Sequence, residues 1–220
     1  MATNNNINKE SPEITIDPGA SGDSFVQFDI NATGEFRIGV DDTDADAFVI
    51  SQGSALGTTN TFRMSAAGER TMPLQSAFLT VLNADILNVT GDGTVYTVVW
   101  DTEVFDQNND FDGTSTFTAP VTGRYRFETN VLMASLASGN TDGYYLIDTS
   151  NRDYYSELSP YGQMDVTTST FPYYLPVMAD MDASDIAVVK VMVAGGTLIV
   201  DIDTNGSANP YCWFSGNLEV

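Results

Sequence analysis

Histidine is absent from this chain of 220 residues, and cysteine occurs once, as Cys212. Without histidine, serine-type catalytic triads, Cys-His pairs and histidine-ligated metals cannot form. A single cysteine leaves no partner for a disulfide within the chain. Among thirty acidic residues some carboxylate pair will match glycosidase spacing by chance, so that spacing indicates nothing. We therefore predict a protein that is not an enzyme and needs no cofactor.

Basic residues are also scarce, since eight Lys and Arg face thirty Asp and Glu and give a formal charge of −22. Such a charge repels phosphate backbones and anionic membranes, so we expect neither nucleic acid nor membrane as a partner. No apolar run approaches membrane-spanning length, and the first residues lack the basic patch and apolar stretch of a signal peptide. The sequence predicts neither bilayer insertion nor export by such a signal.

Strand signals dominate the chain from Phe78 onward, and no stretch has a convincing helical period. After Pro120 and Gly123, side chains alternate between an apolar and a polar face. The apolar positions are Tyr125, Phe127, Thr129 and Val131. The last residues alternate in the same way, with Cys212, Phe214, Gly216, Leu218 and Val220 on one face. Many short strands joined by turns predict an all-β antiparallel sandwich whose final strand is held inside a sheet.

Three motifs in this region occur together in one known family. They are Phe117-x-x-Pro120-x-x-Gly123-x-Tyr125-x-Phe127, then Phe214-Ser215-Gly216-x-Leu218, and Ala77-Phe78 near the start of the region. Their order and separation resemble the C1q/TNF-like jelly-roll family, over roughly Leu74 to Val220. The resemblance implies a jelly roll and a homotrimer, and it implies nothing about chemistry. The candidates for the trimer seam or the adjacent core are Phe117, Tyr125, Phe127 and Phe214, and the sequence does not divide them between the two roles.

The first third of the chain has a different organisation. Residues 1–23 are polar and rich in Asn, which predicts an extended N-terminal arm. Residues 24–74 repeat a short unit of an aromatic and an aliphatic residue two positions apart, as in Phe36-Arg37-Ile38-Gly39 and Phe48-Val49-Ile50-Ser51. They predict a thin β stalk with one apolar face, covered either by three copies of the chain or by the jelly roll at 75–220 of the same chain.

This stalk region resembles repeats found upstream of C-terminal domains in tailed-phage fibre and virion proteins. The similarity rests on residues 36–41, 48–51, 55–57 and 68–75. It implies a trimeric decoration protein on the capsid exterior, which binds the major capsid protein through its arm and stalk. The alternative is the tip of a tail fibre or head fibre that binds a host-surface glycan. A secreted C1q-like module outside any virus is a third interpretation, which the missing signal sequence disfavours.

Two further patterns allow a binding role beside a structural one. The acidic segments 41–46 and 180–185 could each form a calcium loop or a solvated turn. As an EF-hand the first fails, because Ala47 and Gly53 stand where Gly and Glu are needed. A set of tyrosines could stack on sugars or pack within the fold and between subunits. These are Tyr144, Tyr145, Tyr154, Tyr155, Tyr161, Tyr173 and Tyr174.

Overall fold

The computed structural model describes residues 15–19, 21–29, 35–53, 55–157 and 169–220, where the regular elements are strands and one short 3-10 helix. All pairings between these strands are antiparallel, which confirms the predicted all-β fold class. No helix in the described ranges has the length and apolar character needed to cross a membrane. The chain separates into two compact units, Met1–Gln75 and Ser76–Val220, which we call the N-terminal unit and the head. Most of the predicted arm lies outside the described residues, and its role stays a prediction.

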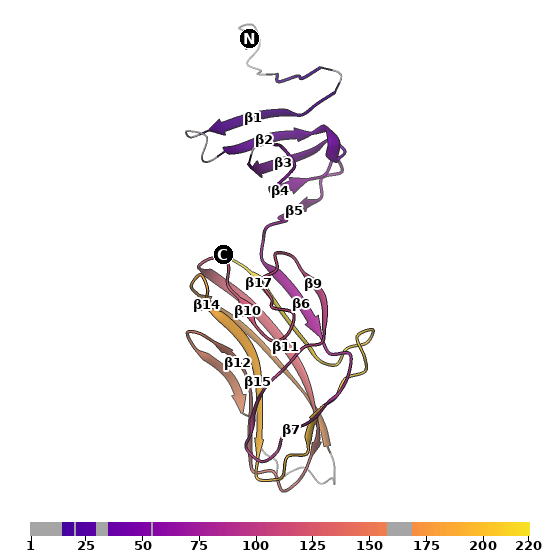
Figure 1. Cartoon of the computed structure of the whole chain (residues 1–220), viewed down its shortest axis with the longest axis vertical. Helices are drawn as coiled ribbons and strands as arrows, with labels where there is room; N and C mark the ends of the chain where they lie inside the picture. The colour runs from indigo at the N-terminus through magenta and orange to yellow at the C-terminus, as the bar shows by residue number, and fades with distance from the viewer. Residues whose placement is uncertain (1–14, 20, 30–34, 54, 158–168) are drawn as a thin grey trace. The chain divides into compact units, whose positions relative to one another are not determined.

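A five-stranded antiparallel sheet forms the N-terminal unit, and each strand pairs with the next along the chain (Figure 1). The strands are β1 (Ser24–Asp29), β2 (Glu35–Asp41), β3 (Ala47–Gln52), β4 (Asn60–Met64) and β5 (Arg70–Thr71). The repeated units of the sequence coincide with β1 to β4. Their aromatic residues are Phe28, Phe36, Phe48 and Phe62. One repeat therefore corresponds to one strand, and residues 30–34 between β1 and β2 lie outside the described residues.

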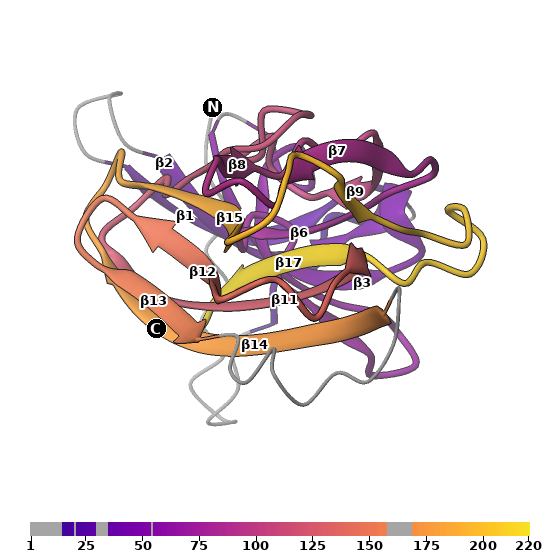
Figure 2. The same ribbon diagram turned by 90° about the horizontal axis from the view of Figure 1, so that it is seen from below.

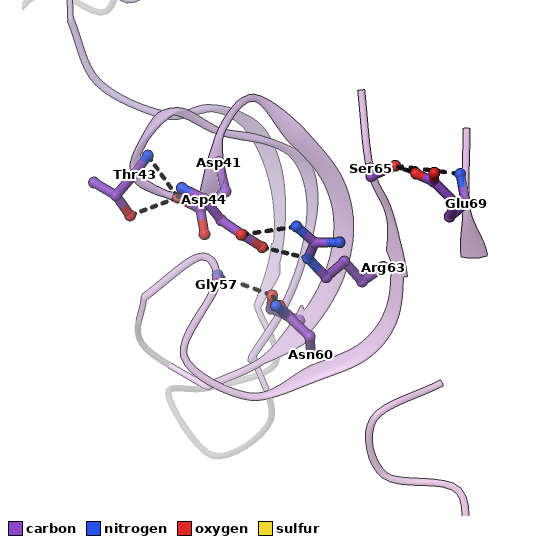
Figure 3. A network of polar contacts seen from close by, with 9 residues as sticks. Asp41, Thr43, Asp44, Gly57, Asn60, Arg63, Ser65 and Glu69 are labelled. Atoms are coloured by element: carbon purple, nitrogen blue, oxygen red, sulfur yellow. Dashed lines mark hydrogen bonds and ion pairs between the residues drawn. The ribbon is translucent and has the colours of Figure 1, made fainter. Parts of the chain in front are cut away.

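Polar contacts close the turn between β2 and β3 and tie it to β4 (Figure 3). Asp41 caps the 3-10 helix η1 (Asp42–Asp44) by accepting hydrogen bonds from the backbone N–H groups of Thr43, at 3.0 Å, and Asp44, at 3.2 Å. Arg63 donates to both carboxylate oxygens of Asp44, and this hydrogen bonding lowers the pKa of Asp44. The segment 41–46 is thus a capped turn. The Asp41 carboxylate accepts hydrogen bonds from the backbone, and the Asp44 carboxylate accepts them from Arg63.

The head is a sandwich of two antiparallel sheets (Figure 1). The first head sheet runs in the order β9 (Thr102–Asp106), β6 (Ala77–Val81), β17 (Trp213–Leu218), β11 (Gly123–Leu136) and β14 (Ser169–Met181), and β16 (Val200–Ile202) and β7 (Ile86–Thr90) extend it beside the end of β11. The second head sheet runs β10 (Phe117–Thr118), β15 (Ile186–Ala194), β12 (Asp142–Thr149) and β13 (Asp153–Glu157), and β8 (Val95–Thr97) also pairs with β15. Strands β11 and β14 pair in the first head sheet, and β12 and β15 pair in the second. The chain thus crosses from one sheet to the other between successive members of this set, which is the strand order of a jelly roll.

The final strand β17 lies inside the first head sheet, as the sequence predicts. It pairs with β11 on one side and with β6 on the other. Figure 2 shows β14, β11 and β17 side by side. This strand order places Tyr125, Phe127 and Phe214 on the inner face of the sheet around Phe78, and Phe117 meets them from β10 of the second head sheet. The Phe78 ring stacks on Phe111 and Phe117, each at 5.1 Å, and meets Phe214 edge-on at 5.0 Å.

Candidate assembly surface

The four aromatic residues considered for the trimer seam or the core all lie in the core of the head. Phe117, Tyr125, Phe127 and Phe214 have no exposed surface within a single chain. The Phe117 ring lies 5.4 Å from that of Tyr125 and 5.3 Å from that of Phe127, and Phe127 lies 5.8 Å from Phe214. Their contacts are made within one chain, so any surface for association lies on the outside of the sandwich.

Strand alternation and the small size of one glycine, Gly216, explain why these aromatic residues lie in the core. Tyr125 and Phe127 occupy inward positions of β11, and the Tyr125 hydroxyl donates a hydrogen bond of 2.8 Å to the carbonyl of Val121, which fixes the bend before the strand. Gly216 of β17 lies directly against the rings of Phe127 and Phe78. A Cβ atom at Gly216 would stand 2.6 Å from carbon atoms of both rings. The glycine is therefore a packing requirement of the motif rather than a flexible point.

The outer face of the first head sheet exposes large apolar side chains, and we call it the apolar head face. Its apolar members are Leu79, Phe105, Tyr174, Pro176, Met178 and Trp213. Tyr174 and Met178 are about half exposed, at 54% and 51%, and the Tyr174 ring lies 5.9 Å from that of Trp213. At one end of this face Arg124 stands opposite Asp180, and between Tyr174 and Met178 the charged side chains Arg126 and Glu128 form an ion pair with each other. The face is therefore apolar at its centre and carries no net charge there.

Sequence reasoning did not single out the apolar head face, although β14 carries a signal for it. Inward positions of β14 hold Tyr173, Leu175 and Val177, which pack against the core. Outward positions hold Pro172, Tyr174, Pro176 and Met178. Because both faces of the strand are apolar, the segment lacks the alternation of a half-buried strand. Such a strand indicates that something covers its second face.

The outer face of the second head sheet mixes charged side chains with apolar ones such as Leu146, Val188 and Met192. Asp148 of β12 and Lys190 of β15 form an ion pair across the two strands. Asp153 of β13 stands opposite Asp148, and a hydrogen bond between the two carboxyl groups raises the pKa of Asp153. Two carboxyl groups and one ammonium thus share this surface, which is suited to contact with water rather than to burial.

The tyrosine pairs do not form a single cluster, because neighbouring residues of a strand point to opposite faces. Tyr145 is fully buried, its hydroxyl donates a 2.7 Å hydrogen bond to the carbonyl of Thr129, and burial raises its pKa. Tyr144 and Tyr155 lie together on the outer face of the second head sheet, with ring centroids 6.4 Å apart. Tyr161 lies outside the described residues. Among these tyrosines, the exposed aromatic pairs of the described residues are Tyr144 with Tyr155 and, on the apolar head face, Tyr174 with Trp213.

The acidic loops of the head mostly bind their own backbone. The Asp106 carboxylate accepts hydrogen bonds from the N–H groups of Asp110, at 3.1 Å, and Phe111, at 2.8 Å. In the segment 180–185, Asp185 accepts from the N–H of Asp182 at 2.7 Å, and Asp180 pairs with Arg152. Across the described residues no group of three or more acidic or cysteine side chains is arranged to hold a metal ion. These carboxylates act as turn caps, and calcium binding stays an untested alternative.

Asp112 is the strongest of these caps, and its charge is expected to stabilise the head. One carboxylate oxygen accepts from the N–H groups of Thr114, Ser115 and Thr116 at 2.8 to 3.0 Å, and from the Thr114 hydroxyl at 2.8 Å. Burial alone would raise the pKa of Asp112, but these donors outweigh it and lower the pKa from 3.8 to about 2. Because the pKa is depressed in the folded state, the stabilisation is present above pH 4 and fades as the pH falls toward 2.

The substitution Asp112→Asn tests this. We expect it to reduce the free energy of unfolding by about 1 kcal/mol at pH 7, since the group is largely exposed and water screens it. At pH 2.5 the difference between the variant and the parent is expected to be much smaller. Urea unfolding at these two values avoids the sequence isoelectric point of about 4.1. Glu103→Gln, which makes the same chemical change within strand β9, is the control, and an equal loss at both pH values would contradict the assignment.

Cys212 has no role as a nucleophile in this structure. It is fully buried, its thiol donates to the carbonyl of Asp203 at 3.1 Å, and its sulfur accepts from the N–H of Leu132 at 3.1 Å. Burial raises the pKa of the thiol to about 12. Because the thiolate is the reactive form, this cysteine acts as an apolar filler of the core, as the sequence predicts.

Among known proteins, similarity to this chain is found in solved structures. No protein-family model matches the chain, and no curated protein sequence matches it. The chain is similar to the globular domain of zebrafish complement 1qA protein, with 16% identity, a TM-score of 0.45, and coverage of 66% of this chain and 98% of that one. It is also similar to murine APRIL, with 13% identity, a TM-score of 0.41, and coverage of 66% and 99%.

Proposed function

We propose that this protein is a non-enzymatic structural component of a tailed-phage virion. It forms a homotrimer that decorates the capsid exterior and binds the major capsid protein through its N-terminal region. The observation that supports this best is the contrast between the two outer faces of the head. One exposes Tyr174, Met178 and Phe105 around the ion pair of Arg126 and Glu128, and the other presents the partly exposed charges of Asp148 and Lys190.

A homotrimer accounts for that contrast in physical terms. Each chain carries a net charge of −22, so copies repel one another unless they meet through an uncharged surface. The apolar head face supplies such a surface. Burying apolar area is favourable by roughly 25 cal/mol per Å². In a closed ring of three, every copy presents this face inward and keeps its charged second sheet in water.

Capsid decoration is proposed ahead of a fibre tip because a rigid trimer suits binding at several neighbouring sites. Three weak contacts made by one rigid trimer gain about 10² to 10⁴ in avidity over a single contact. A trimer could in this way clamp neighbouring capsid subunits against the pressure of the packaged genome.

The test uses virions of the phage that encodes this protein. Antibody to the head, viewed by electron microscopy, is expected to label the capsid shell, and a deletion mutant is expected to lose DNA on heating while adsorbing normally to cells. Label confined to the tail, together with normal heat resistance and failed adsorption, would overturn capsid decoration. That result would support the fibre tip.

The fibre tip is retained as the second candidate because of Tyr144 and Tyr155. Their rings lie 6.4 Å apart on an outer face, and Tyr155 is 61% exposed. Aromatic rings of this kind stack on sugars at recognition surfaces. In this version the same trimer presents the pair to a host-surface glycan.

A further inference from the structure

The two faces of the N-terminal sheet differ sharply in chemistry. Strand register assigns each side chain to one face, and one of them, which we call the apolar stalk face, carries nine large apolar residues in rows across β1 to β4. They are Val26, Phe28, Phe36, Ile38, Val40, Phe48, Ile50, Phe62 and Met64. Among the described strands of this sheet, the apolar stalk face has one ionisable side chain, Arg70 on the edge strand β5. The opposite face carries the acidic residues of the strands, Asp29, Glu35 and Asp41.

Burial runs opposite to this chemistry. On the apolar stalk face, Phe28 is 58% exposed and Phe36 is 46% exposed. On the polar face, by contrast, Arg37, Asp41 and Ser51 are each at most 6% exposed. A soluble protein ordinarily buries its apolar side chains and leaves its charged ones in water. The apolar stalk face is therefore the surface on which this sheet lacks a cover.

The polar face has a cover of its own. Leu56, from the connection between β3 and β4, packs with Ala47 and Val49 in a small buried cluster. The neighbouring Gly57 donates its N–H to the Ser51 hydroxyl at 3.0 Å (Figure 3). It has φ of +80°, and a Cβ there would stand 1.8 Å from a carboxylate oxygen of Asp41. The connection thus seals the polar face closely and leaves no room for a partner at that point.

We propose that the apolar stalk face is covered by the same face of other copies of this chain, so that three sheets enclose one apolar axis. The argument is the separation of charge. If three apolar stalk faces meet, Asp29, Glu35 and Asp41 all point away from the axis, and the repulsion between acidic chains is kept small. A second copy supplies an apolar surface of matching extent by symmetry, and its Arg70 lies at the edge of that surface on β5. This inference rests on the proposed homotrimer and adds a second seam to it.

The test compares two engineered cysteines in the full chain. Val40→Cys lies on the apolar stalk face and Phe25→Cys on the polar face, and the parent side chains are equally exposed in a single chain, at 37% each. The native Cys212 is fully buried and gives a low background. In the purified trimer, a thiol reagent is expected to label the cysteine at position 40 at least tenfold more slowly than the one at position 25.

Sedimentation of the same samples separates the possible failures. A trimer in which both cysteines react at equal rates would overturn the stalk seam and leave the proposed trimer intact. A monomer would overturn the proposed trimer together with the seam. Slow labelling at position 40 in a monomer would show that the chain covers this face itself. Fast labelling in the pure trimer that becomes slow only on virions would assign the face to a capsid protein, and either of these last two results overturns the inference.

Discussion

Gly216→Ala is expected to destabilise the head by about 3 kcal/mol, in the upper part of the range for overpacked cores. The added Cβ would stand 2.6 Å from ring atoms of Phe127 and Phe78. Both rings are at most 1% exposed and touch other aromatic rings, so neither can move without disturbing its neighbours. For a unit of this size such a loss lowers the melting temperature by roughly 10 °C, which calorimetry or circular dichroism measures directly.

The control for this prediction is Gly139→Ala. Gly139 also lies in the head without a positive φ, but a Cβ there would meet nothing within 4 Å. We expect the control to change the unfolding free energy by less than about 0.5 kcal/mol. Equal effects of the two substitutions would mean that the cost comes from the backbone of the glycine. The aromatic packing around β17 would then not be the reason for the glycine in the motif.

Strand alternation in the sequence predicts the inner face of the head well. Tyr125, Phe127 and Phe214 are fully buried, as the alternation requires. The pattern fails at Val220, which shares the predicted face but is 74% exposed. Strand β17 ends at Leu218, and beyond it the side chains no longer follow the face of the sheet. Alternation is therefore informative only as far as the strand pairing extends.

The separation of core from association surface could not be made from the sequence. Aromatic residues at this spacing are expected both in a core and in a buried subunit interface, and this applies to Phe117, Tyr125, Phe127 and Phe214. Assigning them requires knowing that Phe78 and Trp100 fill the space beside them, and these residues come from distant parts of the chain. In the N-terminal unit the apolar face was predictable, because each repeat places its aromatic and aliphatic residues two positions apart. The burial of Arg37 and Asp41 on the polar face of that sheet could not be predicted, because it depends on the fold of the connection that carries Leu56.

Tyr174→Glu is expected to convert the proposed homotrimer of the full chain into a monomer of 23.7 kDa at micromolar concentration. Tyr174 lies on the apolar head face beside Trp213 and opposite Asn130. Desolvation raises the pKa of Tyr174 most, and the negative charge of the nearby Glu128 raises it further. The substitution removes an aromatic anchor, worth roughly 2 kcal/mol or more when it lies at the centre of an interface. It also places a second carboxylate near Glu128, and threefold symmetry repeats both effects three times. Analytical ultracentrifugation measures the result.

Tyr155→Glu is the matched control, because it makes the same change at a tyrosine of similar exposure, 61% against 54%, on the outer face of the second head sheet. If the apolar head face joins the subunits, this control remains a trimer while Tyr174→Glu does not. Dissociation of the control alone would place the seam on the charged sheet. Two trimers would mean that the apolar head face is not needed to hold the subunits together, and the trimer would then depend on the stalk seam. Because both variants add one negative charge per chain, any difference between them reports the location of the charge and not the total charge.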